Sequence, residues 1–261
     1  MGSATGAHNG VVKTRSSTRL AALSMLLAAA AACGSDGGRA AVIDPGDGGN
    51  YAPVIDPAAF VAAVDNPYFP LEPGASWVYE SRADGEVERI EVVVTDERRR
   101  VMGIEATVVR DTVSVDGRTV EDTFDWFAQD RDGNVWYLGE DSKDYEDGRV
   151  VSTEGSWEAG VDGALPGIVM AAGPRVGFAY RQEYWKGVAE DMGEVLRVDG
   201  RASVPAGAFD RLVVTRDWNP FEPDVVEEKY YAPGVGLVLE LKTAGGDERT
   251  ELIEYTATSS S

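Results

Sequence analysis

The chain has 261 residues, with 24 Lys and Arg against 45 Asp and Glu, which gives a formal net charge of -21 at pH 7. Such an acidic protein repels nucleic-acid phosphates, so we expect no nucleic-acid partner. The sole histidine is His8 and the sole cysteine is Cys33. The chain beyond Cys33 therefore excludes a Ser-His-Asp triad, a cysteine nucleophile, a disulfide, and any zinc or haem site built on His or Cys.

The N-terminus has the layout of an export signal. Residues 11–33 read VVKTRSSTRLAALSMLLAAAAAC, in which a basic stretch precedes an apolar run from Leu20 to Ala32. This order is typical of a secretory signal peptide. The apolar run is shorter than the roughly 20 residues that a membrane-spanning helix requires. We therefore expect residues 1–32 to be a signal peptide that is removed after export.

The end of this run resembles the lipobox of bacterial lipoproteins, in which a cysteine sulfur receives a diacylglycerol. Ala30, Ala31 and Ala32 stand directly before Cys33, although the motif usually has Leu at the position of Ala30. The resemblance implies an extracytoplasmic protein that is anchored to the bacterial cell membrane by the diacylglycerol on Cys33. The alternative is an ordinary signal peptide cleaved near an incidental cysteine.

The mature chain divides into a stalk and a domain. Residues 33–54 combine the lipidated cysteine with a stretch rich in Gly, Asp and Pro, which predicts a flexible stalk. Residues 55–261 are predicted to form a single β-rich domain. Its first segment, Asp56 to Val64, starts with an N-cap Asp followed by Pro and has apolar residues at helical spacing. This pattern predicts one short N-terminal helix of about two turns.

The rest of the domain consists of short β-branched and aromatic runs separated by turn signals. Consecutive hairpins predict an antiparallel meander, and about a dozen strands in one domain require strong curvature or closure. We therefore predict a mainly β fold with a single strongly curved antiparallel sheet or a barrel-like meander. Asp-Gly pairs, which favour two-residue hairpin turns, begin at Asp84, Asp116, Asp132, Asp147 and Asp199.

One segment interrupts the rhythm of hairpins. Gly155 to Gly177 is long, glycine-rich and partly apolar. Segments of this kind often cover a binding site, so we expect a lid or plug that lies over the sheet.

Three motifs resemble an uncharacterised group of bacterial secreted lipoproteins. The first, NPYFPLEPGASWVYE from Asn66 to Glu80, contains a YFPL-x-x-G-x-x-W-x-Y signature; the second is DWFAQD from Asp125, followed by GNVWY; the third is YYAPGVGLV from Tyr230. The resemblance covers nearly everything after residue 65. It implies a curved antiparallel sheet around a core or cavity, similar to periplasmic half-barrel carriers of lipids and lipoproteins, and it implies no particular chemistry.

Aromatic side chains are the first candidates for a ligand site, because large rings concentrate binding energy wherever a cavity exists. Neighbours such as Trp136 and Tyr137 point to opposite faces of a strand, so one of each pair must leave the main core. The alternative is that these rings simply form the core. The candidate ligand-binding residues are Trp126, Trp136, Tyr137, Trp157, Tyr184 and Trp185.

A weak calcium site is the only cofactor that the sequence suggests. Asp130, Asp132 and Asn134 alternate along a turn, and their oxygens suit a hard cation. The spacing does not match an EF-hand loop, and an Asp-Gly hairpin turn explains the same residues. A second acidic group, which could contribute or could form a solvated edge, comprises Asp141, Asp144, Glu146 and Asp147.

Paired carboxylates offer a third kind of site, since two of them can perform acid/base hydrolysis. The candidates are Glu183, Glu190 and Asp191 near Arg181 and Lys186, together with Glu121 and Asp125. The simpler expectation is that several acidic residues form cross-strand ion pairs of small energetic value, such as Asp111 with Arg110 and Glu183 with Arg181.

These observations favour a non-enzymatic lipoprotein whose β-sheet cavity binds an apolar or amphipathic, lipid-like ligand. The alternative is a cell-envelope interaction module that docks a protein or glycan through aromatic and acidic surfaces. A carboxylate acid/base hydrolase is the third hypothesis.

Overall fold

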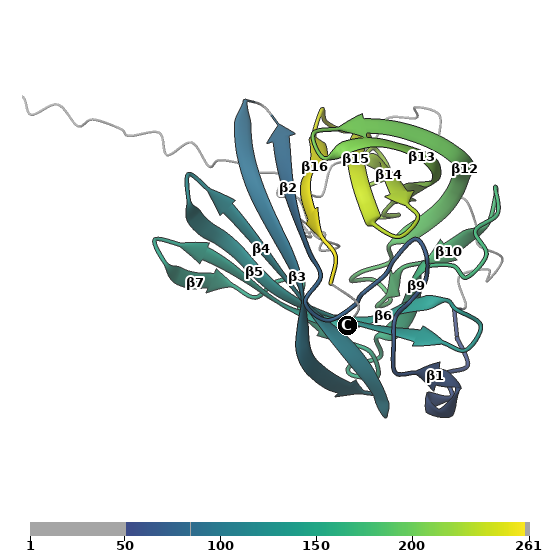
Figure 1. Ribbon diagram of the computed structural model, residues 1–261. Helices are drawn as coiled ribbons and strands as arrows, with labels where there is room; N and C mark the ends of the chain where they lie inside the picture. The colour runs from purple at the N-terminus through teal and green to yellow at the C-terminus, as the bar shows by residue number, and fades with distance from the viewer. Residues whose placement is uncertain (1–50, 84, 259–261) are drawn as a thin grey trace, which may run out of the picture.

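The computed structural model describes residues 51–83 and 85–258. The predicted signal peptide, Cys33 and the stalk up to residue 50 lie outside the described residues. The described chain forms one antiparallel sheet that curls into a nearly closed barrel (Figure 1), which confirms the predicted fold class. No helix in these two ranges is long and apolar enough to cross a membrane.

The strands follow one another as hairpins along the chain. A single turn of 3-10 helix, η1 (Pro57–Ala59), precedes them. The strands are β1 (Phe60–Val61), β2 (Ser76–Ala83), β3 (Glu86–Val101), β4 (Ile104–Val115), β5 (Arg118–Asp130), β6 (Val135–Glu146), β7 (Arg149–Ser152), β8 (Trp157–Glu158), β9 (Leu165–Met170), β10 (Ala179–Arg181), β11 (Glu183–Tyr184), β12 (Met192–Val204), β13 (Gly207–Trp218), β14 (Val226–Ala232), β15 (Gly236–Ala244) and β16 (Arg249–Thr256).

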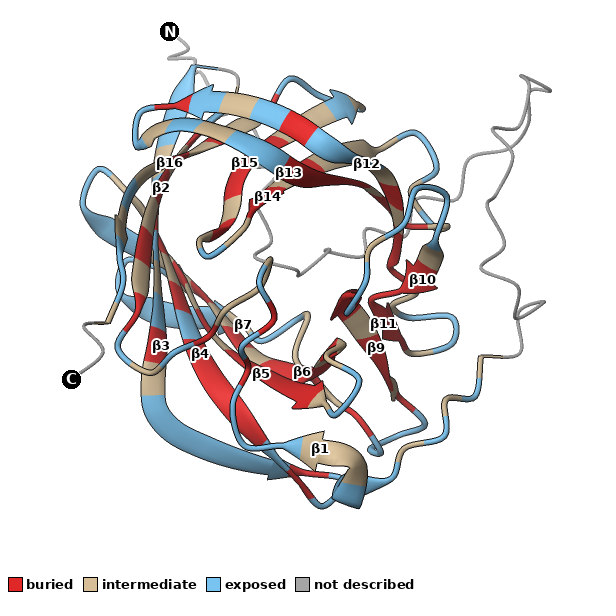
Figure 2. Cartoon of the chain, turned by 45° about the vertical axis from the view of Figure 1, so that its right-hand side comes forward, coloured by how far each residue is buried: buried red, intermediate tan, exposed pale blue. Residues whose placement is uncertain are grey.

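One short segment closes the ring. The sheet order runs β10-β12-β13-β14-β15-β16-β2-β3-β4-β5-β6-β9-β11, and its two ends, β10 and β11, are separated in sequence only by Gln182. Residues 179–184 therefore pair first with β12 and then with β9. The strands encircle an interior (Figure 2), as expected when a strongly twisted sheet satisfies both of its edges.

The predicted two-turn helix from Asp56 to Val64 is wrong. The Asp56 side chain does cap the segment, because its Oδ1 accepts a hydrogen bond from the Ala58 N–H at 3.0 Å. The helix nevertheless ends after one turn, since Phe60 and Val61 pair with Asp130 and Gln129 of β5 instead. A short isolated helix gains little by continuing, whereas pairing with the sheet satisfies the backbone of this segment.

The Asp-Gly turns are only partly as predicted. Asp116-Gly117 and Asp147-Gly148 occupy positive φ angles between consecutive strands, the conformation of tight hairpin turns. Asp199-Gly200, by contrast, lies inside β12, where the register with β13 shifts. The predicted hairpin at that point is therefore wrong, and Gly200 fits there because an added Cβ would lie 2.6 Å from Val214.

The predicted lid at Gly155 to Gly177 is also wrong. Trp157–Glu158 and Leu165–Met170 both pair with β6, so they extend the sheet. Gly167 allows β9 to lie against the closing segment, since an added Cβ would fall 2.2 Å from the backbone of Gln182. The apolar residues of this segment therefore serve barrel closure rather than a cover over a site.

The barrel interior has both apolar and polar stretches. In β4, Val109 and Asp111 face an internal cavity, whereas Arg110 is exposed and pairs with Asp122 at 2.7 Å. The two faces of this strand differ in polarity as predicted, but the expected ion pair between Arg110 and Asp111 is wrong. Adjacent residues of a strand point to opposite sides, so Asp111 is carried into the barrel.

Candidate functional site

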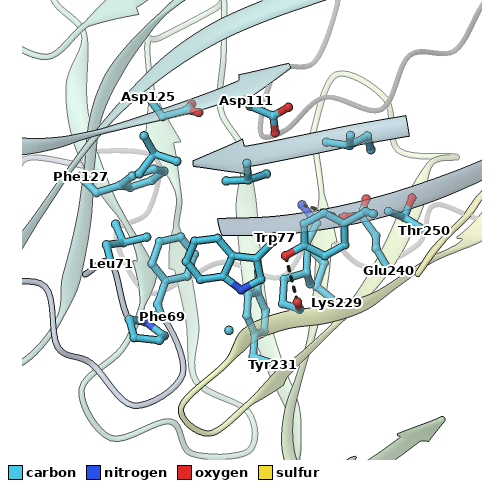
Figure 3. Close-up of a pocket in the computed structure, with 17 residues that line it drawn as sticks. Phe69, Leu71, Trp77, Asp111, Asp125, Phe127, Lys229, Tyr231, Glu240 and Thr250 are labelled. Carbon is cyan, nitrogen blue, oxygen red and sulfur yellow. Dashed lines mark hydrogen bonds and ion pairs between the residues drawn. The ribbon is translucent and has the colours of Figure 1, made fainter. Parts of the chain in front are cut away.

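A cavity of about 130 Å³ lies inside the barrel (Figure 3). Its volume is well above that of one water molecule and close to that of engineered protein cavities that admit benzene. Strands from both halves of the ring contribute to its wall. The lining side chains include Phe69, Leu71, Trp77, Tyr79, Ile90, Val92, Val109, Asp111, Asp125, Phe127, Lys229, Tyr231, Leu237, Glu240 and Thr250.

The apolar end of the cavity is formed in part by the segment that precedes β2. Asn66 anchors this segment: its backbone N–H donates to Gln129 Oε1 at 2.8 Å, and its side-chain amide donates to the Gly133 carbonyl at 2.9 Å. The anchored segment presents Phe69 and Leu71 to the cavity (Figure 3). A loop held by buried hydrogen bonds can thus act as a fixed part of the wall.

Aromatic rings dominate this end. Phe69 packs edge-on against Phe127, with ring centroids 5.3 Å apart, and lies 6.4 Å from Tyr231. Trp77 is held by a hydrogen bond from its indole Nε1 to the Val235 carbonyl at 2.7 Å. These rings supply a preorganised apolar surface for a small ligand.

The opposite part of the wall is acidic. Asp111 and Asp125 come from β4 and β5, while Glu240 and Lys229 come from β15 and β14 across the cavity (Figure 3). Burial raises the pKa of Asp111 well above its usual range, and the nearby carboxylates of Asp125 and Glu121 raise it further. Burial also raises the pKa of Asp125 to about 7, although the hydrogen bond from Tyr137 opposes the rise.

Lys229 is surrounded by carboxylates. Its Nζ lies 3.4 Å from Asp217 Oδ2, 3.9 Å from Glu227 Oε2 and 3.9 Å from Glu240 Oε2. Burial disfavours its charge, but these carboxylates raise the pKa of Lys229 well above its usual value. The ammonium is therefore retained, and its charge is already opposed by three acids.

Two polar atoms on the cavity wall have no partner. Asp111 is 4% exposed and Thr250 is 2% exposed, yet Asp111 Oδ1 and Thr250 Oγ1 make no hydrogen bond. A buried polar atom without a partner costs roughly 1–3 kcal/mol. These two atoms therefore mark the places where a ligand would gain hydrogen bonds.

Four of the predicted aromatic residues lie on two faces of β5, β6 and the adjoining β8. Tyr137 and Trp157 pack together inside, with centroids 5.2 Å apart, and Tyr137 donates to Asp125 Oδ1 at 2.8 Å. Trp126 lies beneath the Arg99 guanidinium at 3.8 Å, and Trp136 contacts Phe60 at 6.3 Å. None of these four rings borders the described cavity, although Tyr137 stacks on Phe127, which does.

The remaining two predicted aromatics belong to the closing segment and its continuation. Tyr184 is buried between Tyr51, at 5.4 Å, and the Arg181 guanidinium, at 4.5 Å. Trp185 is half-buried and forms a bridge with Ala189. Neither ring borders the cavity as described, so the structure places them at the closure of the barrel.

The turn proposed for calcium is stabilised by its own hydrogen bonds. Asp130 Oδ1 accepts from the Asn134 backbone N–H at 2.9 Å, and Asp130 Oδ2 accepts from Trp136 Nε1 at 2.8 Å. Asn134 Oδ1 accepts from the Ala172 N–H at 2.9 Å, and Asp132 is exposed. The described residues contain no group of three or more acidic, His or Cys side chains arranged to hold a metal ion. Calcium binding at this turn stays a prediction.

The structure brings several of the predicted carboxylates together. Glu183 and Asp191 are both buried. Burial raises the pKa of Glu183 well above its usual range, and the charge of Asp191 raises it further. Asn219 Nδ2 donates to Asp191 Oδ1 at 3.0 Å. Glu190 instead pairs with Arg181 at 3.4 Å. Glu121 and Asp125 are near enough to Asp111 to raise its pKa, but of these two only Asp125 borders the cavity.

The candidate aromatic residues did not include the residues that line the cavity, but some of these could have been predicted from the sequence. The inward position of Asp111 follows from its alternation with Val109 and Val113, and the cavity-lining Phe69, Leu71 and Trp77 all lie in the first of the three resemblance motifs. The second motif contributes Asp125 and Phe127, and the third contributes Tyr231 and Leu237. All three motifs thus meet at the cavity.

No protein-family model matches the sequence, and no match is found among curated proteins. Two solved structures are similar. One is a presumed exported protein with a YmcC-like fold from Bacteroides fragilis, at 16% identity and TM-score 0.45. The other is a presumed lipoprotein from Parabacteroides distasonis, at 13% identity and TM-score 0.36. Each comparison covers 73% of this chain and 99% of the other. At these TM-scores, neither similarity bears on the function of this chain.

Proposed function

We propose that the protein is an extracytoplasmic lipoprotein whose barrel binds an apolar or amphipathic ligand in the internal cavity. Its diacylglycerol on Cys33 would tether it to the membrane through the stalk. The observation that carries the proposal is the cavity of about 130 Å³, in which aromatic rings oppose unpartnered polar atoms. This combination suits a ligand with one apolar and one polar part.

The convergence of the three resemblance motifs supports the same proposal. The lipoprotein group that the sequence resembles has its recognisable segments in separate parts of the chain, and here those segments share one wall. Of the carboxyls predicted for hydrolysis, Asp125 borders this cavity, whereas Glu121, Glu183, Glu190 and Asp191 do not. Neither predicted pair is therefore assembled in the cavity, which favours binding over acid/base hydrolysis.

Native mass spectrometry tests the binding proposal. A Cys33→Ser variant, purified from its own host without detergent, should carry a small-molecule adduct. Val92→Phe adds bulk to a residue that lines the cavity, whereas Val93→Phe adds the same bulk to the exposed neighbour on β3. We expect the adduct to be lost only in Val92→Phe. An adduct retained equally by both variants would contradict binding in this cavity.

Membrane fractionation of the same cells tests the anchor. The wild-type chain should sediment with membranes, and Cys33→Ser should remain in the soluble fraction because the acyl chains contribute the membrane affinity. Equal partitioning of the two proteins would contradict lipidation at Cys33.

A further inference from the structure

The cavity contains an acidic corner, formed by Asp111 and Asp125, whose chemistry indicates the class of ligand. Asp111 Oδ1 and Thr250 Oγ1 line the cavity, belong to side chains more than nine-tenths buried, and have no hydrogen-bond partner. Figure 3 shows Asp111 beside Asp125, whereas Thr250 lies beside Glu240, its register partner on β15. A ligand group that donates hydrogen bonds on the side of Asp125 would satisfy Asp111 Oδ1.

The titratable side chains around this corner are acidic. Three carboxyl groups border the cavity, those of Asp111, Asp125 and Glu240, whereas Lys229 is the only cationic side chain on the described wall. Lys229 is already opposed by the three carboxylates that lie 3.4 to 3.9 Å from its Nζ. Arg110, the cation next to Asp111 in sequence, faces outward and pairs with Asp122. A positive charge is therefore missing on the side of Asp111 and Asp125.

The rest of the wall is aromatic and aliphatic. Phe69, Trp77, Phe127 and Tyr231 surround the apolar end. A bare metal ion would have to lose its water there without gaining oxygen ligands, whereas an organic cation brings apolar atoms that suit this surface. Aromatic faces also attract an ammonium group.

We propose that the ligand is an amphipathic amine, whose ammonium group binds Asp111 with support from Asp125 while its apolar body contacts the aromatic end. This inference rests on the proposed function, since it names the chemical class of the ligand in the same cavity. The ammonium group supplies three N–H donors and the charge that this corner lacks. An anionic ligand would meet like charges and is disfavoured.

Binding of an amine should depend on pH. Asp111 is faced by Asp125 and Glu121 on β5, Tyr79 on β2, and Lys229 and Glu240 on the opposite wall, with Asp122 on the outer side of β5. Burial raises the pKa of Asp111 well above its usual range and that of Asp125 to about 7, so both carboxyls gain charge as pH rises. The affinity for an ammonium group should therefore rise as pH increases through this range.

The test compares three probes of similar shape: benzylamine, benzyl alcohol and toluene. Binding to the Cys33→Ser protein is followed by the NMR signal of the Trp77 indole N–H, assigned with Trp77→Phe. At about pH 8 we expect benzylamine to bind about tenfold more tightly than benzyl alcohol, because its bond to the carboxylate is charge-assisted. At about pH 5.5 that advantage should fall by about tenfold, while toluene binding stays constant.

Substitutions locate the effect. Asp111→Asn keeps the shape of the side chain but removes its charge, so it should abolish the advantage of benzylamine. Thr250→Val removes the unpartnered hydroxyl beside Glu240, away from Asp111, and should leave the advantage of benzylamine unchanged. Glu105→Gln is the matched control, because it makes the same charge change at an exposed position of β4. Circular dichroism verifies that each variant is folded.

The outcomes separate the two proposals. Equal affinity for benzylamine and benzyl alcohol would overturn the amine inference and leave ligand binding in the cavity intact. An equal effect of Asp111→Asn and Glu105→Gln would overturn it as well, since general electrostatics would then explain the preference. Failure of all three probes to shift the Trp77 signal would overturn both the inference and the proposed function.

Discussion

The buried carboxyl of Asp125 makes a quantitative prediction about stability. Its pKa rises from 3.8 to about 7 on folding. Below the unfolded value both states are protonated, and above it the unfolded chain ionises first. The raised pKa of Asp125 therefore lowers the free energy of unfolding as pH rises from 3.8 to about 7. By linkage, the free energy of unfolding at pH 7 is lower by about 4 kcal/mol than it would be without the shift. Acidification to pH 5 restores about 2 kcal/mol of this difference.

Asp125→Asn should remove most of this cost. The amide oxygen can still accept the hydrogen bond from Tyr137, which is 2.8 Å long in the native protein, and the amide nitrogen can donate to neighbouring carboxyls. We expect the variant to be more stable than the wild type at pH 7 by roughly 2 to 4 kcal/mol. On acidification from pH 7 to pH 5, the free energy of unfolding of this variant should rise by about 2 kcal/mol less than that of the wild type.

Urea unfolding at both pH values measures these differences, with the midpoint and the slope reported separately so that changes in the denatured state are recognised. Glu105→Gln, on the exposed face of β4, is the control and should follow the wild type. An unchanged difference between pH 5 and pH 7 in Asp125→Asn would refute the assignment of a raised pKa to this carboxyl. Lower stability at pH 7 would refute the claim that its burial is costly.

The first two of three further predictions use the same urea unfolding measurement. Lys229→Met removes the cation that lies 3.4 Å from Asp217 and 3.9 Å from Glu240, both buried, and should lower the free energy of unfolding at pH 7 by about 3–5 kcal/mol; a loss below about 1 kcal/mol would contradict this. Gly167→Ala places a Cβ 2.2 Å from backbone atoms of the closing segment and should cost about 2–3 kcal/mol, unlike Gly173→Ala, which meets no atom within 4 Å. Tyr137→Phe removes a hydrogen bond that lowers the pKa of Asp125, so that pKa should rise above 7 in carboxyl ¹³C NMR titrations; an unchanged or lower value would contradict the role of the hydroxyl.

Local patterns were sufficient to predict the class of fold. β-Branched runs and Asp-Gly turns such as Asp116-Gly117 specify hairpins through short-range backbone preferences, and these hairpins are present. The same local reasoning failed where a tertiary contact competed with it. Phe60 and Val61 pair with β5 although their segment begins like a helix, and Asp199-Gly200 lies within a strand because β13 pairs on both sides of it.

The candidate site could be predicted from the sequence less completely than the fold class. Alternation could place Asp111 and Val109 on one face of a strand, but it could not say whether that face was wet or enclosed. Only closure of the sheet decides this: it brings β4 and β5 opposite β14 and β15, so that Asp111, Asp125 and Lys229 share one cavity.

By itself, the sequence determined the acidic charge, the likeness of its N-terminus to an export signal, and the run of antiparallel hairpins, because each depends on composition or on neighbours along the chain. The tertiary structure alone decided which aromatic rings border a cavity. Phe69 and Trp77 do, whereas Trp126 and Trp136 do not. The physical reason is that a closed sheet turns one face of every strand inward, and partners distant in sequence, such as Phe69 and Tyr231, then meet across the interior.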